Sequence, residues 1–141
     1  MKKNYTLFLF ICALIFSSCS KDFLKSYDRR IIGTWKLFDV DKFGFGRSNN
    51  LPFKEDGLFT FLPDGELVYS SGGNIYKGSW DVRRETSNED GVKTLNITVI
   101  DFVNQKLINE YFNKITFTWS NRFTGTIDEG SRTYVFRFKK Q

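Results

Sequence analysis

Hydrophobic and polar side chains alternate along most of the chain that follows residue 30. In KTLNITVI (residues 93–100), Leu95, Ile97 and Val99 fall on one face, and threonines and an asparagine fall on the other. A period of two is typical of strands with one buried face. Stretches of this kind, bounded by turn-forming residues, cover 31–40, 57–71, 74–84, 93–100, 114–120, 122–128 and 134–140. Because the turn sequence Pro-Asp-Gly at 63–65 divides the second stretch, the pattern predicts about eight strands.

Consecutive strands that are apolar on one side must cover that side. A closed barrel covers it and also removes exposed sheet edges, whereas a two-sheet sandwich leaves edges. Short connections favour neighbouring strands that pair in order. We therefore expect an all-β fold, a small antiparallel up-and-down barrel of about eight strands in a single domain, 31–141. The stretch 102–112 fits either a short helix or a hairpin.

The apolar face of the expected strands is rich in aromatic residues. They could line a cavity for a flat or acyl ligand, or they could fill the interior. Large rings bury 150–250 Å² each, and an eight-stranded barrel has little room inside. We expect a mostly packed core, with any cavity confined to one mouth. The residues of this set are Trp35, Phe59, Phe61, Tyr69, Tyr76, Trp80, Phe117, Trp119, Tyr134, Phe136 and Phe138.

The longest connection, DKFGFGRSNNLPFKED (41–56), contains three phenylalanines outside any strand pattern: Phe43, Phe45 and Phe53. Loops of this length often lie over a barrel mouth. The rings could cap the barrel core, or they could contact a ligand or a partner. We predict the contact role.

The N-terminus has a positive start, an apolar run of 12 residues (5–16) and a small-residue pair before Cys19. This is the layout of a signal peptide, and the run is too short to span a membrane. FSSC at 16–19 resembles the lipobox of bacterial lipoproteins. The resemblance implies a signal peptide 1–18, a lipidated Cys19 with a tether 19–30, and membrane attachment through the lipid. In the sorting rule of enteric bacteria, Ser20 implies the outer membrane. A conventional signal peptide cut elsewhere, or a cysteine at this position by chance, is the alternative.

Charge and composition narrow the chemistry. Without residues 1–18, which hold two of the 21 basic residues and none of the 16 acidic ones, the net charge is 19 − 16 = +3. This is too weak to indicate nucleic acid as a partner. The chain has no histidine and only two cysteines, Cys12 and Cys19. Triads that need histidine are impossible, and we expect no catalytic residues, no cofactor and no metal. Asp39 and Asp41 share a face but lack the further oxygen ligands of a calcium loop.

Several short motifs resemble one family in their order and spacing. IIGTWKL (31–37) is similar to the Gly-x-Trp motif of lipocalins and fatty-acid-binding barrels. FTFLPDGEL, GSW and YVFRFKK then resemble the small lipocalin-like lipoproteins of Bacteroidota, over residues 31–140. The resemblance implies an eight-stranded barrel with an apolar cavity. In lipocalins the motif tryptophan packs under a late arginine, and the matching residues here are Trp35 and Arg137.

Two functions follow as expectations. The first is a non-catalytic binding module for a small apolar ligand, anchored on the outer membrane. The second is an accessory protein that docks on another outer-membrane protein through its exposed aromatic loop, with a packed barrel. An enzyme is a distant third.

Overall fold

The computed structural model describes residues 25–45, 51, 53–85 and 91–141. Within these residues, a short helix, α2 (Tyr27–Ile31), precedes nine strands. Among the described residues, no helix has the length and apolar character needed to cross a membrane. The strands are β1 (Gly33–Gly44), β2 (Leu58–Phe61), β3 (Glu66–Ser71), β4 (Asn74–Arg84), β5 (Lys93–Asp101), β6 (Lys106–Phe112), β7 (Lys114–Thr118), β8 (Arg122–Glu129) and β9 (Arg132–Lys140).

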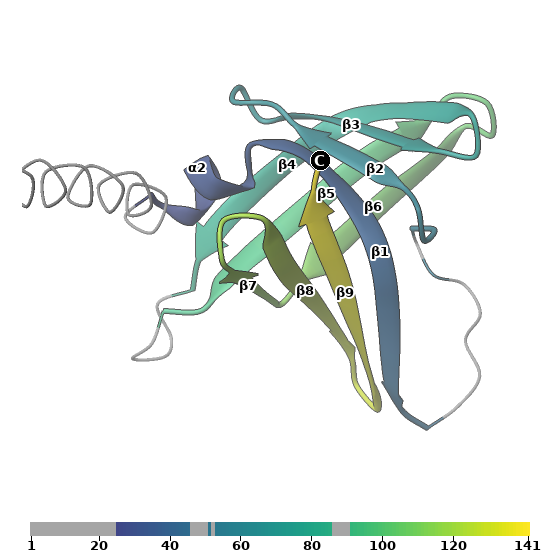
Figure 1. Ribbon diagram of the computed structural model, residues 1–141. Coiled ribbons are helices and arrows are strands. Elements are labelled where there is room, and N and C mark those ends of the chain that lie inside the picture. The colour runs from purple at the N-terminus through teal and green to yellow at the C-terminus, as the bar shows by residue number, and fades with distance from the viewer. Residues whose placement is uncertain (1–24, 46–50, 52, 86–90) are drawn as a thin grey trace, which may run out of the picture.

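The strands form one antiparallel sheet in the order β6-β5-β4-β3-β2-β1-β9-β8-β7. Apart from the return of β9 to β1, strands that pair are consecutive in the chain, and the sheet curls into a nearly closed barrel (Figure 1). This confirms the expected small all-β barrel. The stretch 102–112 is a turn followed by β6, so the ambiguous segment supplies the ninth strand. Asn113 alone separates β6 from β7, which are the two edge strands of the sheet.

Strands β6 and β7 run in the same direction and are joined by a bend at Asn113, whereas the turns of the antiparallel hairpins alternate between the two ends of the barrel. We call one the helix end: it holds α2, the β2–β3 turn (62–65), the β7–β8 turn (119–121) and the C-terminus. We call the other the loop end: it holds the end of β1 and the turns β3–β4 (72–73), β5–β6 (102–105) and β8–β9 (130–131). In Figure 1 the β8–β9 hairpin and the β5–β6 turn point to different sides, so the loop-end rim is wide.

Aromatic rings fill the centre of the barrel. Phe123 and Phe138 stack with ring centroids 4.3 Å apart, and Trp35 meets Phe123 edge-on at 4.8 Å. Phe112 from β6 packs on Phe136 from β9 at 5.3 Å, which joins the two sides of the seam. Offset and edge-on ring pairs add to the stabilisation that burial provides. The interior is therefore held by packing, with no disulfide among the described residues.

A bulge in β1 determines which side chains face inward. Strict alternation would place Asp39 and Asp41 on the same face as Trp35 and Leu37. The register with β9 shifts between Leu37 and Asp39, so that Val40 pairs with the buried Phe136. An extra residue in one strand reverses the faces that follow it. The bulge thus turns both aspartates to the outside of the barrel.

Candidate functional site

Most of the aromatic residues expected inside the barrel lie there. Three more contact the core while partly exposed: Tyr76, Trp80 and Phe117. Trp80 still satisfies its indole N–H, which donates to the Leu62 carbonyl at 3.0 Å. The fully or almost fully buried members are Trp35, Phe59, Phe61, Tyr69, Tyr134, Phe136 and Phe138.

Trp119 is the exception, and its expected interior position is wrong. The strand alternation ends at Phe117, and residues 119–121 form the turn between β7 and β8. Trp119 takes a positive φ of 64° there, and its side chain is 81% exposed. Sequence spacing alone continued the strand for one residue pair too many.

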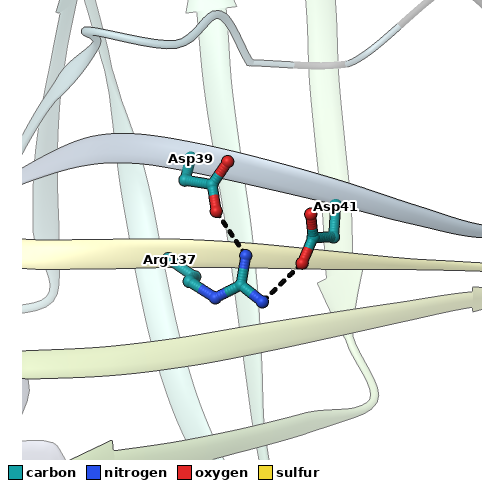
Figure 2. Close-up of polar contacts among 3 residues, drawn as sticks. All are labelled: Asp39, Asp41 and Arg137. Carbon is teal, nitrogen blue, oxygen red and sulfur yellow. Dashed lines mark hydrogen bonds and ion pairs between the residues drawn. The ribbon is translucent and has the colours of Figure 1, made fainter.

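Arg137 does not cap Trp35, which corrects the role implied by the lipocalin resemblance. It lies on the outer face, opposite Asp39 in the β1–β9 register, and its guanidinium contacts the carboxylates of Asp39 and Asp41 (Figure 2). Hydrogen bonds to Asp41 and Asp39 raise the pKa of Arg137 above its ordinary value. The cation near the Trp35 ring is instead Lys140, with Nζ 5.2 Å from the ring centroid.

The three phenylalanines of the long connection do not act together. Phe53 is fully buried and meets the rings of Phe59 and Tyr69 edge-on at 5.0 and 5.1 Å, so it caps the core and presents no surface to a protein partner. Phe43 and Phe45 are 54% and 91% exposed at the loop end. Only these two remain available to a partner.

Three hollows among the described residues lie outside the aromatic core. One, of about 240 Å³, is lined by outward-facing polar residues of β4, β5 and β6, including Asp81, Asn96 and Asn109. Hollows of about 200 and 30 Å³ lie beside α2. Among the residues that the structure describes, no group of three or more histidines, cysteines and carboxylates gathers as metal ligands do.

A cluster of exposed apolar side chains surrounds the β5–β6 turn. Ile100 of β5 pairs directly with Leu107 of β6, and both face outward, because Val99 and Asp101 on either side of Ile100 are buried. Lys77 of β4 pairs with Ile100, and Ile75 lies two residues before Lys77 in the same strand. Ile75 therefore faces outward on the same side as Ile100. We call the cluster the β5–β6 patch: Ile75 (67% exposed), Ile100 (41%), Phe102 (67%), Val103 (81%) and Leu107 (61%).

This patch was missed from the sequence, although a signal existed. Ile100 continues the face of Thr94, Asn96 and Thr98, where a polar residue is expected. A single exposed apolar residue is common, and it is the contiguity of Ile100 with its neighbours, which only the fold shows, that marks a contact surface.

The patch borders an open strand. Among the described strands, β6 pairs with β5 and with no other, so the backbone groups on its other side face the seam. Exposed strand edges readily accept a strand from another protein. Glu110 of β6 and Glu129 of β8 lie across this seam: burial first, and then the charge of Glu129, raise the pKa of Glu110.

The comparisons with known proteins add no relative. No family model, no curated protein and no solved structure matches the chain. Cys19, the expected lipidation site, lies outside the described residues.

Proposed function

We propose that this chain is a lipoprotein of the bacterial outer membrane whose barrel is a non-catalytic module for docking on another outer-membrane protein. The lipobox-like FSSC sequence supports the anchor, with Cys19 as the acylated residue. The order of the short motifs supports membership of the lipocalin-like lipoproteins of Bacteroidota. Neither feature depends on an interior ligand.

The observation that carries the docking function is the β5–β6 patch beside the open edge of β6. Its five apolar side chains are 41–81% exposed, and two of them pair across neighbouring strands. A contiguous apolar surface of this kind is typical of a protein contact. A partner strand added to β6 would satisfy its free backbone groups and would cover Leu107 at the same time.

The small apolar ligand that the family resemblance implies stays a prediction. The residues that would line its cavity are in ring-to-ring contact, as with Phe59 and Phe138 at 5.4 Å. Phe53, which could have been a lid, is part of this packing. The filled centre therefore favours docking over ligand storage.

The docking function is tested by recovering partners from outer membranes that carry the full-length, affinity-tagged chain after cross-linking in cells. Substituting Val103 and Leu107 by Ser should abolish recovery of a specific membrane protein while the melting temperature stays within a few degrees of wild type. Phe38→Ser, which changes an aromatic residue of β1 that is 42% exposed, is the matched control.

Two results would change the assignment. If the double variant Phe43→Ser with Phe45→Ser abolishes recovery, and the variant with Val103 and Leu107 replaced by Ser does not, docking uses Phe43 and Phe45 at the end of β1 instead. If all variants recover the same protein equally, neither apolar surface is the interface. Lipid extraction from the same material, with mass spectrometry, tests the apolar-ligand alternative.

A further inference from the structure

Basic side chains gather beside the β7–β8 turn at the helix end of the barrel, whereas the acids of this end, Asp28 and Asp64, lie in α2 and in the β2–β3 turn. Arg122 of β8 and Lys139 of β9 are direct cross-strand partners, and both face outward because their neighbours Phe123 and Phe138 are buried. Like charges directly opposite each other destabilise a sheet. Within the described part of the chain, neither residue has a carboxylate within ion-pair distance. Arg137, two residues before Lys139, shows the contrast, because it lies between two aspartates.

More cations surround this pair. Arg30 donates to the Trp119 carbonyl at 3.0 Å, which fixes α2 against the β7–β8 turn. Arg29, Arg30 and Lys140 line one small hollow with Ser120 of the same turn. The sequence contains no acid from 111 to 127 and none after Glu129. We call this surface the basic face: Arg29, Arg30, Trp119, Arg122, Lys139 and Lys140.

Trp119 adds an exposed apolar side chain to the basic face. Its side chain is 81% exposed, and the positive φ of 64° holds it at the tip of the turn rather than in the sheet. Tryptophan among basic residues is typical of surfaces that lie at a membrane interface, because the indole partitions to the headgroup region and the cations attract anionic lipids.

The chain enters the barrel at this same end. The helix α2 begins at Tyr27, so the seven residues from Ser20 to Ser26 separate Cys19 from the helix. Even fully extended, they reach about 25 Å. If Cys19 carries lipid, the helix end is therefore held next to the bilayer.

We propose that the basic face binds the phosphate-bearing headgroups of an anionic membrane surface, with Trp119 inserted at the interface. The anchor part of this inference rests on the proposed lipoprotein function; the charge and exposure of the basic face do not. The barrel then stands with its helix end on the membrane, and the β5–β6 patch points away from it.

The test uses the full-length protein, reconstituted into vesicles of phosphatidylethanolamine with phosphatidylglycerol, and into vesicles of phosphatidylcholine alone. Acrylamide quenches the fluorescence of exposed tryptophans; Trp35 is fully buried and Trp80 partly buried. The part of the quenching that is lost in the Trp119→Phe variant therefore reports on Trp119. We expect anionic vesicles to remove most of this quenching relative to detergent, because the indole then lies in the headgroup region. The double variant Arg122→Glu with Lys139→Glu should restore it. Lys54→Glu with Lys77→Glu makes the same charge change elsewhere on the barrel and should leave the protection intact.

Mass spectrometry of the N-terminal peptide separates this inference from the anchor. If Cys19 is acylated and Trp119 stays as accessible in anionic vesicles as in detergent, membrane binding by the basic face is refuted and the lipoprotein proposal stands. If Cys19 is not acylated, salt-sensitive co-sedimentation with the anionic vesicles, lost in the Arg122 and Lys139 double variant, supports the basic face on its own. Protection of Trp119 only in whole outer membranes, and not in lipid vesicles, would mean a protein contact and would overturn the membrane assignment.

Discussion

The indole N–H of Trp35 donates a hydrogen bond of 2.6 Å to the carbonyl oxygen of Ile31. Both residues are fully buried, so this bond fixes the end of α2 to the first strand of the barrel. The helix α2, which ends at Ile31, has only five residues and could not form in isolation. The helix therefore depends on the barrel through Trp35.

Trp35→Ala should lower the free energy of unfolding by about 3–5 kcal/mol, because it removes a large buried ring and leaves a cavity. Chemical denaturation monitored by circular dichroism measures the change. Trp119→Ala is the control, since an exposed tryptophan in a turn should change stability by about 0.5 kcal/mol or less. Similar losses for the two variants would contradict the buried position of Trp35.

Gly78→Ala should destabilise the barrel by about 1–3 kcal/mol or more, as other overpacked sites do. A Cβ atom at Gly78 would lie 1.8 Å from the Thr98 carbonyl oxygen, so strands β4 and β5 would have to separate. Gly72→Asn is the matched control: nothing lies within 4 Å of a Cβ there, and asparagine tolerates its φ of +58°. Urea unfolding of both variants gives the comparison; an unchanged midpoint for Gly78→Ala would contradict the close approach.

Glu110→Gln should raise the stability of the protein at neutral pH and should change its stability little in acid. Burial, followed by the charge of Glu129, raises the pKa of Glu110 above its ordinary 4.5. The native state then holds this proton more tightly than the unfolded chain does. The stabilising contribution is complete below pH 4.5 and is lost as the pH rises through the native pKa.

The measurement is the difference in melting temperature between Glu110→Gln and wild type, taken at several values from acid to neutral pH. It should grow with pH. Glu129→Gln should act in the same direction but less strongly, because it removes the smaller of the two causes. A difference that is constant with pH would show that Glu110 is not desolvated at the seam.

Arg137→Met should destabilise the protein more than Arg132→Met does. Without Arg137, the carboxylates of Asp39 and Asp41 remain close together on the outer face with no guanidinium between them (Figure 2). We expect about 1 kcal/mol, because the residues are partly exposed and water screens the charges. Adding Asp39→Asn and Asp41→Asn should recover most of this loss; denaturant midpoints without such recovery would contradict the charge explanation.

Cys19→Ala should leave the precursor uncut or misplaced and move the protein out of the detergent phase on phase separation. The thiol of Cys19 is the expected site of acylation, and Cys12, the other cysteine, lies inside the apolar run of the expected signal peptide. Detergent partitioning that is the same for Cys19→Ala and wild type would refute the anchor.

The sequence was enough to predict the barrel, because alternation is a local signal that repeats in every strand. It was not enough to place residues where the alternation breaks. The bulge after Leu37 depends on pairing with β9, some hundred residues away, so the outward position of Asp39 and its contact with Arg137 could not be read from spacing. Phe53 sits outside any strand, and only the fold shows that its ring is buried while Phe45 is exposed.

The position of β1 in the sheet has a mechanical consequence. Trp35 and Lys36 each pair on both sides, with β2 and with β9, so the first strand after the N-terminal segment is an interior strand. A pull on that segment, directed along β1, must shear two ladders of hydrogen bonds together instead of peeling one strand from an edge. The barrel is thus joined to the segment that would attach it to a membrane through a strand that is paired on both sides.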